Sequence, residues 1–160
     1  MAADPENTLI LDLKTGPVTI ALRPDLALGH VARIKELTRR GFYDGVAFHR
    51  VIPGFMAQTG DPTGTGAGGS DLPDLRAEFS AEPHKRGTVS AARTANPDSA
   101  NSQFFICFAD APWLDRQYSV WGEVVEGMDH VDAIKAGGEH NNGAISGEPD
   151  RILKARIAAD

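Results

Sequence analysis

The stretch FHRVIPGFMAQTGD, residues 48–61, places one arginine in an otherwise apolar, strand-like run. The run turns at Pro53-Gly54, a pair typical of tight turns, and ends on an amide and an acid. A guanidinium buried without partners would lose its hydrogen bonds, so Arg50 is expected either at a rim or paired with an acid such as Asp61. Arg50 is therefore either a structural rim residue or a functional group, and the rest of the chain decides between the two.

The length and composition indicate one ordinary globular domain. A chain of 160 residues can bury most of its apolar surface without disulfides, so we expect a single domain over residues 1–160 with a core from about 7 to 158. Seventeen glycines and ten prolines predict many loops and tight turns. The net charge of −6 argues against a protein whose main task is to bind nucleic acid.

Cysteine usage and the N-terminal residues indicate the compartment. The single cysteine, Cys107, excludes an intrachain disulfide framework and suits a reducing environment. The first twenty residues contain Asp4, Glu6 and Asp12, and their longest apolar run, residues 9–11, is too short for a signal peptide. No later stretch approaches the length of a membrane span. We therefore expect a cytoplasmic protein that contacts no membrane.

Short alternating runs separated by glycine, proline and aspartate dominate the chain. Residues 8–13 and 18–22 alternate apolar and polar positions and predict a hairpin. Helical spacing over 30–41 and 128–138 predicts two helices that end at Gly41 and Gly137, with a loop at 139–149. The remaining predicted strands are 47–52, 55–59, 87–92, 103–108, 118–125 and 151–158. This pattern favours a mainly β fold, a closed or nearly closed antiparallel barrel.

Several motifs could suggest other chemistry but lack the necessary context. GTGAGG (64–69) matches a dinucleotide-binding fingerprint, yet no βαβ unit surrounds it, so a surface loop is expected. The five histidines show no ligand spacing with each other or with Cys107, and we expect no metal and no cofactor. His49 lies in a predicted strand and is expected to be packed rather than catalytic. Cys107 and Trp121 are expected to fill the core.

Three blocks of sequence together point to a family. They are FHRVIPGFMAQTGD (48–61), SANSQFFICFADAPWLD (99–115) and YSVWGEVVEGM (118–128). In order and spacing they resemble the cyclophilins, the peptidyl-prolyl cis–trans isomerases that cyclosporin inhibits, and a looser likeness extends over residues 7–158. The resemblance implies an eight-stranded antiparallel β-barrel capped by two α-helices. It also implies a shallow groove in which an extended peptide lays a proline ring into an apolar pocket.

The resemblance assigns roles residue by residue. Arg50 matches the family's essential arginine and, with Phe55 and Gln58, is expected to be catalytic. Arg93, Thr94 and Ala95 fall where the family offers backbone groups to the peptide, in an alignment that can shift by one residue. Tyr118 replaces a histidine on the pocket wall, and Trp113 retains the indole that binds cyclosporin. The expected substrate-binding residues are Met56, Thr94, Ala95, Phe105, Trp113, Leu114 and Tyr118.

The turn at Pro53-Gly54 tests whether Arg50 and Gln58 can act together. A two-residue turn would set Arg50 opposite Ala57 and leave Gln58 on the other face of the hairpin. A longer turn or a bulge is required if both side chains line one groove.

The expected activity is rotation about X–Pro bonds in peptides and refolding proteins, carried out by a monomer. Rotation cleaves no bond and so requires no nucleophile, metal or proton shuttle. One alternative is a catalytically idle module on the same fold that only binds or scaffolds proline peptides. A second alternative is a nucleotide-binding protein built on GTGAGG.

Overall fold

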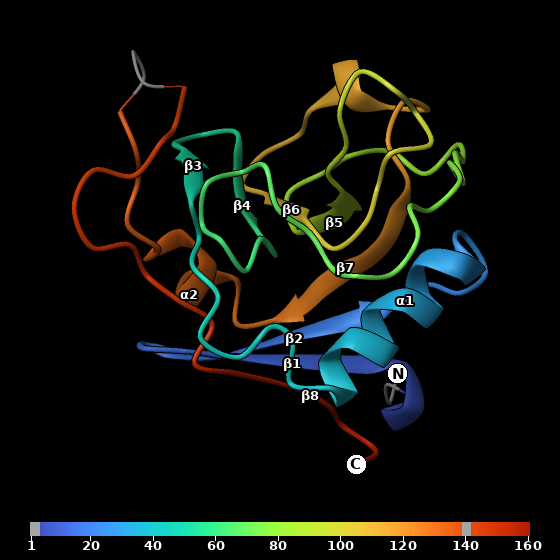
Figure 1. Ribbon diagram of the computed structural model, residues 1–160, viewed down its shortest axis with the longest axis horizontal. Coiled ribbons are helices and arrows are strands. Elements are labelled where there is room, and N and C mark those ends of the chain that lie inside the picture. The colour runs from blue at the N-terminus through green and yellow to red at the C-terminus, as the bar shows by residue number, and fades with distance from the viewer. Residues whose placement is uncertain (1–3, 139–141) are drawn as a thin grey trace.

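The computed structural model describes residues 4–138 and 142–160, which form one eight-stranded antiparallel sheet with two α-helices (Figure 1). The order of the strands across the sheet is β3-β4-β6-β5-β7-β2-β1-β8. The strands are β1 (Thr8–Leu13), β2 (Gly16–Leu22), β3 (Arg50–Ile52), β4 (Met56–Thr59), β5 (Thr88–Ala91), β6 (Phe104–Cys107), β7 (Val120–Glu126) and β8 (Lys154–Ile157). All eight lie within or next to the predicted runs.

The sheet curls into a half-barrel whose two edges approach each other. β3 and β8 are the edge strands, and a bridge between Ala47 and Arg151 joins the segments that precede them. There the amide of Phe48 donates to the carbonyl of Asp150 over 2.9 Å. This closure agrees with the prediction of a nearly closed antiparallel barrel.

Alternation along the strands fills the inside of the barrel. Leu9 and Leu11 of β1 are fully buried and lie opposite Ile20 and Val18 of β2, so the predicted hairpin is confirmed. The fully buried Trp121 meets Phe104 edge to face, with ring centroids 5.2 Å apart. Aromatic pairs in this geometry add to the stabilisation that burial alone provides.

Helix α1 (Leu28–Arg39) packs against β8 and β7 with the predicted apolar stripe. Val31, Ile34 and Leu37 are buried, and Gly41 ends the segment with a φ of +74°, a conformation that glycine adopts without strain. The N-terminus has no side-chain cap of its own, because its N-cap is Ala27. The distant Glu78 replaces that cap by accepting from the amides of residues 29 and 30 over 2.9 and 3.1 Å.

Helix α2 spans only Met128–Asp132, so the prediction of a helix over 128–138 was wrong at its C-terminal end. The backbone beyond Asp132 is used elsewhere. The amide of Lys135 donates to the carboxylate of Asp150 over 2.8 Å, and the amide of Gly137 donates to the carbonyl of Val51 over 2.8 Å. The second of these bonds supports the edge strand β3, and both compete with continuation of the helix. Residues 139–141 of the predicted loop lie outside the described residues.

The two ends of the described chain lie side by side, away from β3 and β4 (Figure 1). The amide of Ala159 donates to the carbonyl of Pro5 over 3.1 Å, next to the short 3-10 helix η1 (Pro5–Asn7). Arg39 of α1 bridges the carboxylates of Glu6 and Asp160 at 3.1 and 2.9 Å. Both ends are thus fixed to the same part of the molecule.

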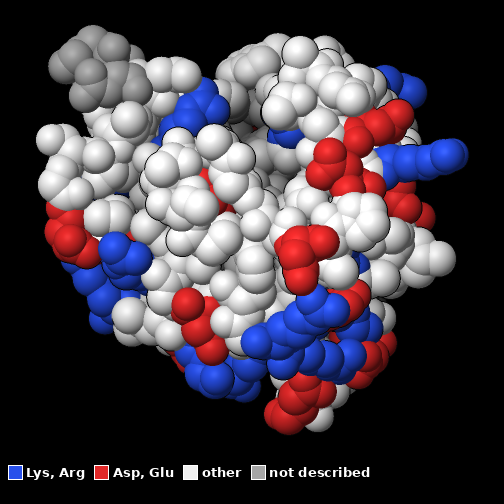
Figure 2. All heavy atoms as spheres, viewed as in Figure 1, with Lys and Arg blue, Asp and Glu red and all other residues white. Residues whose placement is uncertain are grey.

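The surface shown in Figure 2 carries basic and acidic side chains side by side rather than as one basic field. Neither helix among the described residues is long and apolar enough to cross a bilayer.

Candidate active site

A surface hollow of about 190 Å³ opens on the outer face of the sheet. The strands β3, β4 and β6 supply its floor, and the short helix η2 (Pro112–Leu114) with the segments after β5 and before β7 supply its walls. Its lining residues are Arg50, Phe55, Met56, Gln58, Ala92, Arg93, Phe105, Leu114 and Tyr118. The structure therefore brings together seven of the ten predicted site residues.

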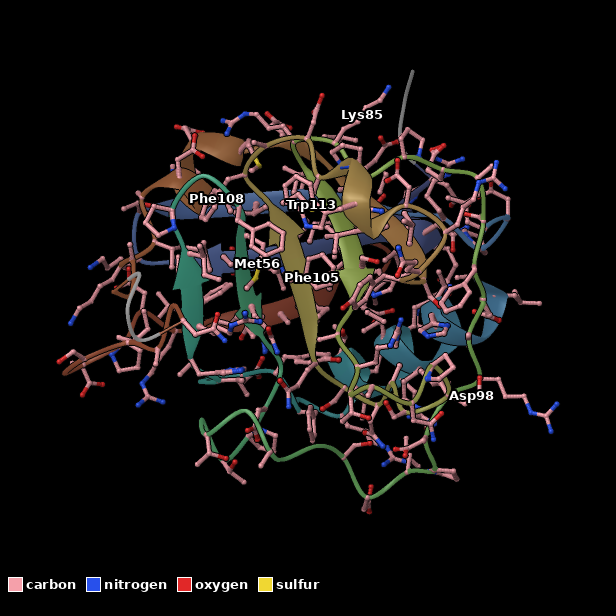
Figure 3. The ribbon with its side chains drawn as sticks, turned by 90° about the horizontal axis from the view of Figure 1, so that it is seen from above. Met56, Lys85, Asp98, Phe105, Phe108 and Trp113 are labelled. Carbon is pink, nitrogen blue, oxygen red and sulfur yellow. The ribbon has the colours of Figure 1, made fainter. Side chains whose placement is uncertain are left out.

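The hollow rests on an apolar cluster that is separate from the barrel core. Along β6, Phe104 and Ile106 point into the barrel, whereas Phe105 and Cys107 join the outer cluster. Figure 3 shows Met56 and Phe105 together in this region, with Trp113 beside them. Strand β6 is consequently buried on both faces, which explains its continuous apolar sequence.

The register of the β3–β4 hairpin brings Arg50 and Gln58 to the same side. The turn contains three residues, Pro53 to Phe55, and Gly54 has a φ of +75°. With that turn Arg50 pairs with Gln58 and Val51 pairs with Ala57. The longer turn required by the sequence analysis is therefore present.

Arg50 is half-buried and held by neutral partners. Its Nη1 donates to Oε1 of Gln58 over 3.2 Å, while Nε and Nη2 donate to the carbonyl and Oδ1 of Asn142 over 2.9 and 3.0 Å. Within the described residues Arg50 forms no ion pair, so the expected alternative of pairing with Asp61 is not observed. Among the described residues, three of its five N–H groups have partners, so two remain for a ligand in the hollow.

A chain of amides connects Gln58 to the glycine-rich loop. Nε2 of Gln58 donates to Oε1 of Gln103 over 2.9 Å. Nε2 of Gln103 in turn donates to the carbonyls of Gly66 and Gly68 over 3.0 and 2.9 Å. Sequence reasoning did not single out Gln103, although it lies in the second family-like block. The amide chain fixes the orientation of Gln58 and therefore of the Arg50 guanidinium.

The GTGAGG stretch is a loop folded around one carboxylate. Asp61 is fully buried and accepts from the amides of Thr63, Gly66 and Gly68. Burial alone would raise the pKa of Asp61, but the hydrogen bonds from Thr63 and the glycine amides outweigh it and hold the pKa well below its usual range. No helix begins in residues 62–69, so the expected surface loop is confirmed.

His84 supports the aromatic wall of the hollow from behind. Its buried ring lies parallel to Phe105, with centroids 6.2 Å apart, and Tyr118 meets Phe105 edge to face at 5.6 Å. Nδ1 of His84 lies 3.1 Å from Oδ1 of Asp115, and Nε2 lies 3.1 Å from Oγ of Ser90. Burial lowers the pKa of His84 despite the opposing effect of Asp115, whose carboxylate is partly exposed.

The other predicted site residues lie at or beyond the rim. Trp113 is 60% exposed and packs against Phe55 with ring centroids 5.6 Å apart. Thr94 lines a neighbouring hollow of about 500 Å³ that also contains Gln103. Ala95 lines neither hollow. Ala92 and Arg93 reach the first hollow instead, because the chain leaves the sheet after Ala91.

The sequence also matches a family model, described as "Cyclophilin type peptidyl-prolyl cis-trans isomerase/CLD", over residues 8–157. The chain belongs to this family. The resemblance seen in three blocks is thereby confirmed, together with the fold and the isomerase activity that it implied.

Relatives of this cyclophilin agree in sequence and in structure. A probable peptidyl-prolyl cis-trans isomerase of Brucella suis biovar 1 is 61% identical over 170 residues, covering 99% of this chain and 86% of the relative. Cyclophilin AquaCyp293 from Hirschia baltica superimposes with a TM-score of 0.88 at 30% identity, covering 100% and 77% of the two chains. A Cryptosporidium parvum cyclophilin, crystallised in the presence of the dipeptide Ala-Pro, gives 0.84 at 25% identity and covers 94% and 98%.

Proposed function

We propose that this cyclophilin rotates X–Pro bonds in proline-containing peptides and refolding proteins by holding the proline ring in the hollow beside Arg50. The observation that carries the proposal is the position of Arg50: its guanidinium borders an apolar hollow, and two of its N–H groups have no partner among residues 4–138 and 142–160. Phe55, Met56, Phe105, Leu114 and Tyr118 would hold the ring. The Ala-Pro dipeptide present with the Cryptosporidium parvum relative supports this class of ligand.

The chemistry depends on how the proline nitrogen changes during rotation. Amide resonance opposes rotation with a barrier of about 20 kcal/mol. At the twisted transition state the nitrogen regains a localised lone pair and becomes a better hydrogen-bond acceptor. A donor placed beside it interacts more strongly with the transition state than with either planar isomer, which is the condition for lowering the barrier.

Arg50 suits this role because a guanidinium remains charged at any relevant pH and has a planar array of donors. Gln58 and Asn142 fix that plane before the peptide arrives. A charge-assisted hydrogen bond of about 1.5–3 kcal/mol corresponds to roughly one to two decades in rate. Displacement of water from the apolar hollow and tight binding of the proline ring would supply the rest of the rate acceleration.

Replacing Arg50 with alanine tests the proposal. We expect kcat/KM for an Ala-Pro peptide to fall at least tenfold, measured by a protease-coupled assay, while the thermal midpoint changes little because Arg50 is only half-buried. Arg156→Ala, at an exposed position of β8, is the matched control and should retain full activity. Equal losses of stability and activity in Arg50→Ala would assign Arg50 a structural role. A wild-type protein that binds the peptide without accelerating rotation would be the idle module instead.

We also propose that cyclosporin binds over the hollow and covers Trp113. Trp113 is 60% exposed whereas Trp121 is buried, so binding should alter the emission of Trp113 alone. Titration with cyclosporin should therefore shift the fluorescence of the wild type and leave that of Trp113→Phe unchanged. A silent wild-type titration would contradict the placement of the drug. The monomeric state and the cytoplasmic location stay predictions, of which the first is testable by light scattering.

A further inference from the structure

Arg93 is a second guanidinium at the hollow, and its side chain has no role in the mechanism above. It follows β5 and lines both the proline hollow and the neighbouring hollow of about 500 Å³. Gln58 and Ala92 also border both hollows. Arg93 therefore lies on the ridge between them, where a peptide that runs from one hollow into the other must pass.

The protein holds the Arg93 side chain in place. Its guanidinium carbon lies 4.6 Å from the ring centroid of Tyr118 and 5.8 Å from that of Phe79. Nε and Nη2 donate to the carbonyl of Gln117 over 3.0 and 2.6 Å, and Nη1 donates to the carbonyl of Thr94 over 2.8 Å. Three of five N–H groups are thus used, which leaves one on each terminal nitrogen.

The charge of Arg93 is not balanced by a carboxylate. Its three partners are neutral carbonyls, and no ion pair joins it to any acid of residues 4–138 and 142–160. Arg86, in contrast, binds Asp132 through both terminal nitrogens at 2.9 and 2.6 Å. Asp74, the one acid that lines the second hollow, accepts from Nδ2 of Asn101 over 3.1 Å. The ridge therefore carries a fixed and uncompensated positive charge.

We propose that Arg93 makes this isomerase prefer peptides with an acidic side chain one or two residues before the proline. The inference rests on the proposed function, because it assumes that the proline ring occupies the first hollow. A carboxylate beside the ring can accept from the N–H groups of Nη1 and Nη2 that have no partner among the described residues. Because Arg93 is already immobilised against Tyr118, binding a carboxylate costs little additional side-chain entropy.

The test uses two sets of peptides. In the first set the residue before the proline is Glu, Gln, Ala or Lys, and in the second set the same four residues stand one position earlier. Exchange NMR measures catalysed rotation without an auxiliary protease that has its own charge preference. In one of the sets we expect wild-type kcat/KM for Glu to exceed that for Gln about three- to fivefold, with Lys lowest. Raising the salt to about 0.5 M should reduce this ratio.

Variants separate the role of the charge from the packing of Arg93 on Tyr118. Arg93→Gln should bring the Glu to Gln ratio to about one, Arg93→Lys should keep part of it, and Arg156→Gln should leave it unchanged. An equal loss for every peptide in Arg93→Gln would show that Arg93 only covers Tyr118, and it would overturn the inference. Equal wild-type rates for Glu and Gln in both sets would overturn it too while leaving the proposed function intact. Failure of the wild type to rotate even the Ala peptide would refute the proposed function itself.

Discussion

At the scale of single residues, His84 shows how a buried polar ring can build an apolar wall. Its face supports Phe105, and its two nitrogens meet Asp115 and Ser90, so the ring is buried without an unsatisfied polar atom. A neutral ring suits this environment, with Nδ1–H donating to the carboxylate and Nε2 accepting from the hydroxyl. A phenylalanine could pack against Phe105 but would leave Ser90 without that bond.

The buried histidines should make stability fall as the pH is lowered from about 7.5 to 5.5. Burial lowers the folded-state pKa of His84 and of His49 below the usual value of 6.5. Below about pH 6.5 the unfolded chain therefore binds protons that the folded chain does not, and the free energy of unfolding decreases. For His84 the slope is at most about 1.4 kcal/mol per pH unit.

Urea unfolding of wild type and His84→Gln across this range measures the effect. Glutamine can both donate to Asp115 and accept from Ser90, so the variant should fold and show a shallower slope. Part of the slope should remain because of His49. A variant as steep as the wild type would show that His84 does not contribute.

At the scale of elements, the loop after β4 depends on the carboxylate of Asp61. Asp61→Asn removes the charge and places N–H groups against the amides of Gly66 and Gly68. We expect a loss of about 2–4 kcal/mol in the free energy of unfolding, measured in urea. We also expect a lower kcat/KM, because Gln103 loses the ordered carbonyls that hold it.

The matched control for that variant is Asp98→Asn. Asp98 is exposed and accepts one bond at its carboxylate, from the amide of Ala77, which asparagine can also accept. The pH dependence provides a second check. Since the folded-state pKa of Asp61 is lowered, its contribution is present above the ordinary value of 3.8 and is lost as the pH falls further. Asp61→Asn should be less sensitive to acid than the wild type in that range. Equal effects of the two substitutions would contradict the role given to Asp61.

The regular elements were predictable because their signals are local. Alternation and turn residues located every strand of the sheet, and helical spacing located α1. The same spacing predicted a second helix that is longer than α2. Ile134 continues the apolar pattern, but the backbone there already turns towards β3. The irregular segment over 62–85 gave no such signal. It is held by distant side chains, as when Glu78 caps α1 and Asp115 accepts from the amide of His84.

The candidate site was predictable only through the family resemblance. Periodicity alone could not place Arg50 beside Gln58, because their pairing depends on whether the turn has two or three residues. Gln103 and His84 contact other side chains rather than the proline hollow, so the sequence could not assign their roles even though Gln103 lies in the second family-like block. Ala95 lines neither hollow, and its predicted backbone contact with the peptide stays a prediction because the alignment of the segment after β5 can shift by one residue.

At the scale of the whole molecule, one sheet separates the apolar cluster that stabilises the fold from the cluster that forms the hollow. Adjacent residues of β6 should therefore respond differently to substitution. Ile106→Ala, inside the barrel, should cost about 2–5 kcal/mol of stability and leave the kcat/KM of the folded protein near wild type. Phe105→Leu should reduce kcat/KM about tenfold with a smaller loss of stability.

Urea midpoints and kcat/KM measured on the same preparations check this separation. If Ile106→Ala reduced the activity of the folded protein as much as Phe105→Leu does, the two clusters would be mechanically coupled through β6. Their independence would mean that the barrel interior can be repacked for stability without altering the hollow.

The paired chain ends have a practical consequence. Because the two described ends lie side by side and away from β3 and β4, a fluorophore or an affinity tag attached next to either of them should not obstruct peptide entry. A short linker between the ends would also allow circular permutation, in which the new termini are placed in a surface loop.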